Sequence, residues 1–181
     1  MHTDVIGQVP AHMLPYAHTP KTGARIMTRI LAALALILTT TAAQAQMAPR
    51  DGWSVTPTDK PYDQLIDDVK AAAKANRMGV VTQAGPTGAA RNRGITIPGN
   101  RVIGLFNNVY AVNILNLSTA ATIEAPVRMY VTENEDGTAT LSYKLPTAVF
   151  APYAEEAGTE LETLAGELDT IFAAISAQAT Q

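Results

Sequence analysis

The stretch "APVRMYVTENEDGTATLSYKLP", residues 125–146, decides the fold of this chain. Apolar and polar side chains alternate on both sides of Asp136-Gly137, a pattern typical of two half-buried strands joined by a tight turn. The side chains of one face are Val127, Met129, Val131, Ala139, Leu141, Tyr143 and Leu145. The sequence therefore predicts an antiparallel β-hairpin that buries this apolar face.

The length of the turn decides which residues face one another. A two-residue turn at 136–137 would place Val131 opposite Ser142 and mix the faces, because side chains alternate along a strand. A loop of three residues, 135–137, places Val131 opposite Leu141, with its glycine in the left-handed conformation. The same register pairs Met129 with Tyr143 and Val127 with Leu145. We therefore expect the three-residue loop.

The polar face of the hairpin carries two cations. In this register Arg128 lies opposite Lys144, and like charges in direct opposition destabilise a sheet unless something neutralises them. One interpretation is a bound small anion, such as a carboxylate ligand. The alternative, the more ordinary arrangement for surface charges, is that Glu124, Glu133 or a neighbouring strand neutralises them on a solvated or dimer-facing sheet.

Two further polar side chains join the candidate ligand-binding set. Tyr130, opposite Ser142, lies on the same face as the two cations. Asn107 follows a buried strand and could present a free side-chain amide, although an Asn at such a turn more often caps the backbone. The candidate ligand-binding residues are Arg128, Lys144, Tyr130 and Asn107.

Helices and further strands surround the hairpin. Apolar side chains recur every three to four residues, as in amphipathic helices, in two segments. Their stripes are Tyr62, Leu65, Ile66, Val69 and Ala73, and Leu161, Leu164, Leu168, Ile171, Phe172 and Ile175. Thr58 or Asp59 would cap the first helix, which should end near Asn76. Strands are expected at 53–56, 78–84 and 101–106, and a helix at 110–117.

These elements follow the order β-α-β-β-α-β-β-α. This order predicts an α+β domain in which the two striped helices pack on one face of an antiparallel sheet. Residues 46–52 would form a flexible lead, and residues 53–178 a single α+β domain. That length is enough for one domain with a modest core.

The beginning of the chain has the pattern of a secretory signal peptide. Its apolar run, 30–38, has nine residues, whereas a membrane-spanning helix needs about 20. Basic residues precede the run, and an A-x-A cleavage site follows it. We therefore expect a signal peptide at 27–45, cleaved between Ala45 and Gln46. A buried core helix is the less favoured alternative for the apolar run.

This signal would send the protein to the periplasm or outside the cell. Residues 1–26 precede Met27, which by itself opens a signal peptide of ordinary length. They are expected to be an extension of the gene model or a long n-region. The chain has no Cys to carry a lipid, so no stable membrane anchor is expected after cleavage.

The processed chain would be acidic. Of 16 Asp and Glu residues only Asp4 precedes residue 46, and of 13 Lys and Arg residues only Lys21, Arg25 and Arg29 do, so the net charge becomes −5. An acidic domain with scattered cations is a poor nucleic-acid binder, because phosphate contact needs a clustered basic face. No nucleic acid is expected among the partners.

The processed chain would also lack two chemically versatile residue types. All three histidines, His2, His12 and His18, precede the expected cleavage site, and the chain contains no Cys. Structural zinc sites, His-based triads, thiolate nucleophiles and disulfides are therefore excluded from it. The sequence indicates no metal and no cofactor.

Residues 89–153 resemble a known family. The stretch "AARNRGITIPGNRVIGLFNN", residues 89–108, and the hairpin stretch are similar to the domain of unknown function 302 family. The positions that match its pattern are Gly94, Pro98, Asn107, Pro126, Asp136, Gly137, Tyr143 and Pro146. Phe106 and Asn108 stand where the family has the Gly and Pro of a Gly-Asn-Pro turn, and Ala125 replaces a Leu. The sequence therefore departs from the family's pattern at that turn.

The resemblance implies a fold and leaves the activity open. It implies a compact α+β domain, similar to the TATA-binding-protein-like half fold, that can pair as a homodimer. The favoured hypothesis is an exported, non-enzymatic module that binds a small ligand or another protein through its open sheet face. The alternatives are a hydrolase-type enzyme that uses carboxylate, Lys or Tyr groups, and a purely structural homodimer.

Overall fold

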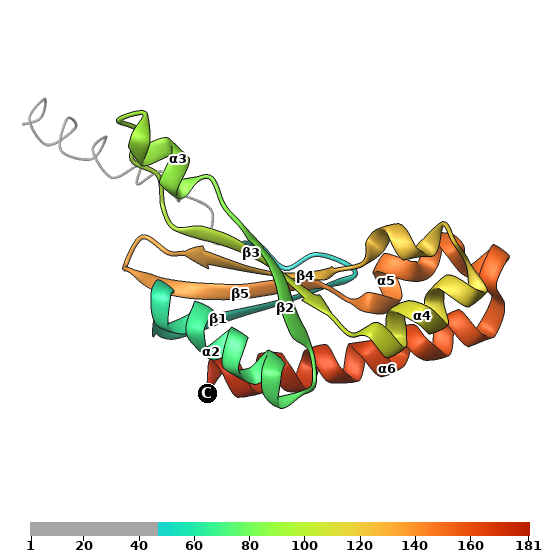
Figure 1. Ribbon diagram of the computed structural model, residues 1–181. Helices are drawn as coiled ribbons and strands as arrows, with labels where there is room; N and C mark the ends of the chain where they lie inside the picture. Colours follow the sequence, from blue (N-terminus) through green and yellow to red (C-terminus); the bar gives the residue numbers. More distant parts are fainter. Residues whose placement is uncertain (1–46) are drawn as a thin grey trace, which may run out of the picture. The chain divides into compact units, whose positions relative to one another are not determined.

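The computed structural model describes residues 47–181; the expected signal peptide, its cleavage between Ala45 and Gln46, and the segment 1–26 lie outside the described residues. Five strands form one antiparallel sheet in the order β1-β5-β4-β3-β2 (Figure 1). The strands are β1 (Trp53–Pro61), β2 (Gly79–Ala84), β3 (Asn100–Phe106), β4 (Val127–Glu133) and β5 (Thr138–Lys144).

Helices occupy the connections and the end of the chain. They are α2 (Tyr62–Ala75), α3 (Thr87–Asn92), α4 (Asn108–Leu117), α5 (Pro146–Phe150) and α6 (Ala154–Thr180), with 3-10 turns η1 (Ala121–Glu124) and η2 (Ala151–Tyr153). Apart from the short helices α3 and α5, the order of elements is the predicted one. The predicted α+β class, with helices packed against an antiparallel sheet, is confirmed.

The central hairpin has the predicted register. Its pairs include Val131–Leu141, Met129–Tyr143 and Tyr130–Ser142. The Asn134 N–H donates to the carbonyl oxygen of Thr138 at 2.8 Å, which closes the loop 135–137. Gly137 has a φ of +81°, the left-handed conformation that this loop needs and that glycine adopts without strain.

The end of the hairpin differs from the prediction. The ladder between β4 and β5 stops one position before Arg128 and Lys144. On their other sides Lys144 pairs with Trp53 of β1, and Arg128 pairs with Gly104 of β3. The outer pair predicted at Leu145 is also absent from the ladder between β4 and β5. The Leu145 N–H donates to the Gly52 carbonyl oxygen, in the chain preceding β1, at 2.8 Å. The two cations therefore lie on neighbouring strands without being ladder partners.

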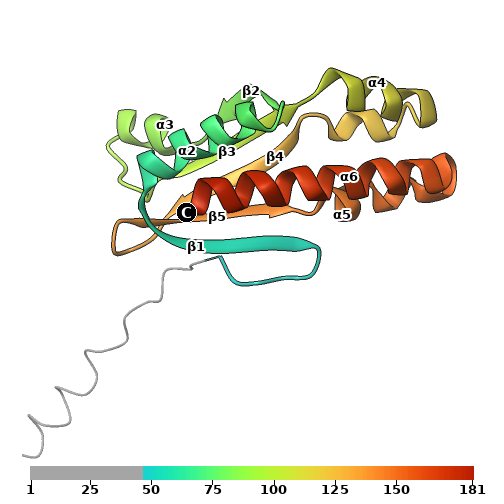
Figure 2. The same cartoon turned by 90° about the horizontal axis from the view of Figure 1, so that it is seen from below.

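Helices α2 and α6 lie side by side against one face of the sheet (Figure 2). The fully buried side chains between these layers include Leu65, Val69, Met129, Val131, Leu141, Phe172 and Ile175. The ring centroids of Tyr143 and Phe172 are 5.5 Å apart, so the predicted core position of this tyrosine is confirmed. The core occupies this face, and the opposite face of the sheet carries Arg128, Tyr130 and Lys144.

The junction between β1 and α2 corrects the predicted helix start. β1 continues to Pro61, and α2 begins at the next residue, so neither Thr58 nor Asp59 caps the helix. The Thr58 hydroxyl donates to the Ala139 carbonyl oxygen at 2.7 Å, which ties the additional part of β1 to β5. The predicted end of this helix is confirmed, because Asn76 is its C-cap residue.

The last helix, α6, has 27 residues. It is interrupted at Gly158, whose φ of 71° and ψ of −165° are not helical. Leu161, Leu168, Phe172 and Ile175 of the predicted stripe are buried, and Leu164 and Ile171 are partly buried. Between residues 47 and 181, no helix is both long and apolar enough to cross a membrane.

Candidate functional site

A groove of about 840 Å³ lies on the face of the sheet opposite helices α2 and α6. All five strands contribute to it, and α5 and η2 close one end. Its apolar side chains include Trp53, Val102, Tyr130 and Val149, and its charged side chains among the described residues are Glu124, Arg128 and Lys144. We call this cavity the groove.

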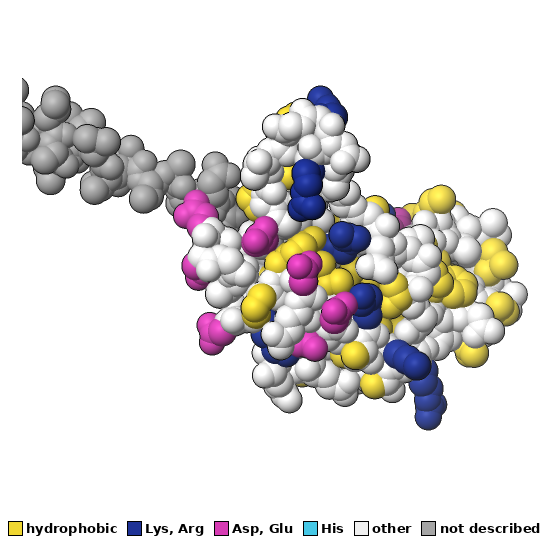
Figure 3. All heavy atoms as spheres, turned by 60° about the vertical axis from the view of Figure 1, so that its left-hand side comes forward, with side chains coloured by type: hydrophobic (Ala, Val, Ile, Leu, Met, Phe, Trp, Pro, Cys, Tyr) yellow, Lys and Arg dark blue, Asp and Glu magenta, His cyan; other side chains and the backbone are white. Residues whose placement is uncertain are grey.

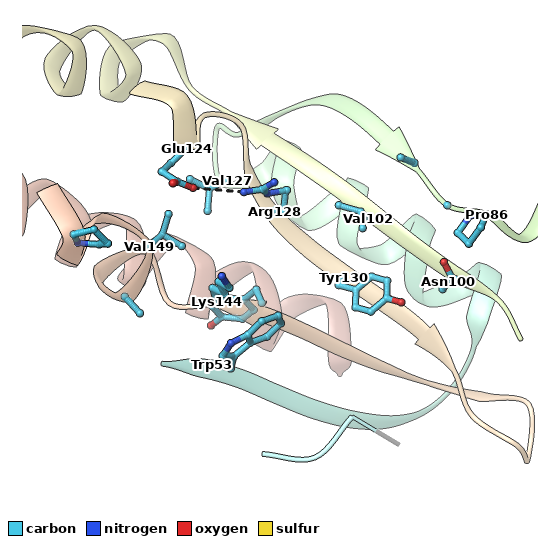
Figure 4. A pocket seen from close by; sticks show the side chains of 15 residues that line it. Trp53, Pro86, Asn100, Val102, Glu124, Val127, Arg128, Tyr130, Lys144 and Val149 are labelled. Carbon is cyan, nitrogen blue, oxygen red and sulfur yellow. Dashed lines mark ion pairs between the residues drawn. The ribbon is translucent and has the colours of Figure 1, made fainter. Parts of the chain in front are cut away.

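The charged residues gather at one end of the groove. Figure 4 shows Arg128 beside Glu124 and Lys144 beside Trp53 in one half of the groove, whereas Asn100 and Pro86 lie at the opposite end. The side chain of Tyr130 lies between these ends. The structure therefore brings together three of the four predicted site residues, which are Arg128, Tyr130 and Lys144.

The alternation of the strands places these side chains. Val127 and Met129 on β4 are buried, and Arg128 between them is exposed on the other face. Gly104 is the ladder partner of Arg128 and places no side chain beside it on this face of the sheet. A Cβ atom at Gly104 would collide with the hydroxyl of Thr82 and lie 2.8 Å from a ring carbon of Pro126. Close packing therefore requires a glycine beside Arg128.

Arg128 has a carboxylate partner. A guanidinium nitrogen lies 3.5 Å from Glu124 Oε2, and 61% of the arginine side chain is exposed. The Tyr153 hydroxyl donates to Glu124 Oε1 at 2.9 Å, and this hydrogen bond raises the pKa of the tyrosine. Glu124 thus supplies one of the neutralising contacts considered for the hairpin. Glu133 does not, because its carboxylate accepts the Gly99 N–H at 2.6 Å.

Lys144 lies beside an aromatic ring instead of a carboxylate. Its Nζ is 5.8 Å from the centroid of the Trp53 ring, within the range of cation–π attraction. The guanidinium carbon of Arg50 lies 5.2 Å from the same centroid, in a turn that precedes β1. Within residues 47–181, Lys144 forms no ion pair. Its ammonium group is therefore available to an anion.

Asn107 lies apart from the groove. As the N-cap residue of α4, it accepts the Val109 N–H on Oδ1 at 2.9 Å. Its Nδ2 donates to the Arg77 carbonyl oxygen at 3.0 Å. Both ends of the amide are engaged with backbone, which is the capping role considered as the alternative. Asn107 is therefore not assigned to the ligand site.

Most of the apolar side chains that line the groove were not predicted from the sequence. Trp53 was expected only as part of a short strand, and alternation with its neighbours was the one signal that could have indicated its face. Val102 and Val149 enter the groove from β3 and α5, far apart in the chain. No local pattern joins such residues, because only the tertiary fold brings them together.

The groove lacks the pairs of groups that many hydrolytic mechanisms use. Among the described residues, Glu124 is the only carboxylate that lines the groove, and paired-carboxylate acid–base chemistry needs two. In the part of the chain that the structure describes, no three His, Cys, Asp or Glu side chains gather as ligands of a metal ion. Arg128 and Lys144 are the other charged groups that line the groove.

Charged side chains elsewhere are mixed in sign. On the face shown in Figure 3, Lys and Arg side chains lie singly among acidic and apolar ones. Lys60 pairs with Asp68, and Lys70 with Asp67, each at 2.6 Å. The described residues therefore form no continuous basic surface on this face.

Comparison with known proteins supports the fold. A crystal structure described as an uncharacterized conserved protein DUF302 from Bacillus stearothermophilus is similar, with a TM-score of 0.64 and 17% sequence identity. The match covers 72% of this chain and 99% of that chain. No curated protein matches. The family "Domain of unknown function DUF302" matches residues 53–176, more than the 89–153 interval that carried the resemblance. The chain therefore belongs to the DUF302 family.

Proposed function

We propose that this protein is a binding module that holds a small organic anion in the groove. The observation that carries the proposal is the placement of Arg128 and Lys144 at the same end of a cavity with apolar walls. Within residues 47–181 a single carboxylate, Glu124, lines that end, so the described cations are in excess. Organic anions combine a charge for such an end with an apolar part for the walls.

A titration with hexanoate tests the proposal. Emission from Trp53, the single tryptophan of the chain, reports binding because its ring lines the groove. The double variant Arg128→Ala/Lys144→Ala should bind hexanoate at least about tenfold more weakly, since hydrogen bonds to charged groups contribute about 1.5–3 kcal/mol each.

A matched control variant removes two positive charges outside the groove. Lys74 and Arg93 are exposed and do not line the groove. Lys74→Ala/Arg93→Ala should therefore bind hexanoate like the wild type. Equal affinities in all three proteins, or no response of the wild type, would contradict the proposed function.

The proposal includes export of the module to the periplasm or the medium. The basic residues, the apolar run and the A-x-A site within residues 25–45 support it. Intact-mass measurement of the protein from its own cells should give a chain that begins at Gln46. Peptides from residues 1–20 in that protein would contradict both processing and the gene-model interpretation of the upstream segment.

A further inference from the structure

Resting on the proposed anion site, we propose that the groove selects an amphipathic monocarboxylate: one carboxylate at the Arg128–Lys144 end and an apolar body along the sheet. This inference goes beyond anion binding, because it specifies the number of charges and the nature of the rest of the ligand. The volume, the charge balance and the distribution of apolar side chains lead to it.

The volume excludes a small ion, inorganic or organic, as the matching occupant. Cavities of roughly 300–1,000 Å³ enclose drug-sized ligands. The groove has about 840 Å³, so a sulfate or an acetate ion would leave most of it to water. A ligand that fills the groove has a body many atoms long.

The charge balance indicates one negative charge on the ligand. The charged lining residues are Glu124, Arg128 and Lys144, which sum to one positive charge. Glu124 stays close to Arg128, at 3.5 Å, and accepts a hydrogen bond from Tyr153 at 2.9 Å. Because this carboxylate is held in place, it repels a second negative charge on the ligand. Arg50 contacts Trp53 but does not line the groove.

The walls beyond the charged end suit an apolar body. Val102 and Tyr130 are ladder partners on β3 and β4, and both lie in the groove between the cations and Asn100. The indole of Trp53 flanks the charged end, so a carboxylate near Lys144 brings the attached carbons next to this ring. Burial of such carbons is favourable in proportion to the apolar area removed from water.

Three probes separate charge from apolar contact. Decanoate has both the carboxylate and the apolar chain, decanol has the chain alone, and acetate has the carboxylate alone. Each is titrated below its aggregation limit while the emission of Trp53 is followed. We expect decanoate to bind at least tenfold more tightly than either of the others.

Two variants locate the apolar body. Val102→Thr keeps the shape of the side chain but replaces one methyl group with a hydroxyl. The variant should therefore weaken decanoate binding severalfold and leave acetate binding unchanged. Val81, which is 52% exposed on β2 and does not line the groove, provides the control Val81→Thr. The control should bind decanoate like the wild type.

Each outcome has one meaning. Acetate that binds as tightly as decanoate would overturn the amphipathic ligand and leave the anion site standing. Decanol that binds as tightly as decanoate would overturn the role of charge in selection. Absence of binding by hexanoate, decanoate and acetate alike would overturn the proposed function itself.

Discussion

The ammonium nitrogen of Lys144 lies 5.8 Å from the centroid of the Trp53 ring, and the two residues are direct partners in the ladder between β1 and β5. This pairing places a cation and the only tryptophan of the chain side by side at one end of the groove. A ligand that contacts Lys144 therefore changes the surroundings of the Trp53 indole, and the emission of Trp53 reports the binding.

Arg128 should matter for binding and little for stability. Its side chain is 61% exposed and its ion pair with Glu124 is 3.5 Å long, so Arg128→Ala should change the free energy of unfolding by no more than about 0.5 kcal/mol. Hexanoate affinity should fall about tenfold in the same variant. Urea unfolding and the Trp53 titration measure the two quantities.

The same experiment distinguishes a ligand site from a dimer interface. In a purely structural homodimer, replacement of Arg128 and Lys144 would shift the dissociation constant of the dimer and leave hexanoate affinity unchanged. Sedimentation of wild type and double variant over a range of concentrations measures this constant. A large shift without any change in hexanoate affinity would favour the structural alternative.

Gly104 should not tolerate a side chain. Its added Cβ would collide with Thr82 and lie 2.8 Å from Pro126, so Gly104→Ala should lower the free energy of unfolding by about 1–3 kcal/mol. Gly88 in α3 is the matched control, because nothing lies within 4 Å of its added Cβ. Gly88→Ala should leave stability unchanged or raise it slightly. Equal denaturation midpoints of the two variants would refute the packing described beside Arg128.

Phe172 should be one of the residues on which the core depends. It is fully buried on α6, and the centroid of its ring lies 5.5 Å from that of Tyr143. Phe172→Ala should cost about 3–5 kcal/mol, through lost burial and the cavity that remains. Ala177→Ser, at an exposed position of the same helix, should change stability by less than about 0.5 kcal/mol. A loss below 1 kcal/mol for Phe172→Ala would contradict the packing of α6 on the sheet.

The hairpin loop should respond to acid. The hydroxyl of Thr138 donates to Asp136 Oδ1 at 2.6 Å and its N–H donates at 3.0 Å, and these bonds lower the pKa of the aspartate. A lowered pKa in the folded state means that the stabilisation is present above the usual value of 3.8 and is lost as the pH falls through the folded value.

Thr138→Val tests this assignment, because it removes the hydroxyl and keeps the N–H. The pKa of Asp136 should rise toward its usual value without reaching it, as measured by carboxyl NMR titration. The variant should also lose less stability than the wild type over the acid range. An unchanged pKa would show that the hydroxyl does not hold the carboxylate.

The hairpin could be predicted from sequence because its information is local. Alternation decides the faces, and a single glycine decides the loop, so only one register buries Val131 with Leu141. The end of β1 was missed for the opposite reason. Thr58 has the side chain of a helix cap, but its hydroxyl donates to Ala139, 81 positions away, and the tertiary contact prevails.

The candidate site was predictable only in its charged part. Arg128, Tyr130 and Lys144 belong to one hairpin, so their common face follows from strand periodicity. That the two cations are not ladder partners was not predicted, because the ladder between β4 and β5 ends one position earlier, at Met129 and Tyr143. Residues of all five strands, of α5 and of both 3-10 turns line the groove, so its depth and its apolar wall have no signature in any single segment.

A crystal structure of the protein with decanoate tests the central claim most directly. The account predicts the carboxylate within hydrogen-bond distance of both Arg128 and Lys144, with the alkyl chain along Val102 and Tyr130. Decanoate bound elsewhere on the molecule, or bound in the groove with its carboxylate toward Asn100, would contradict the account.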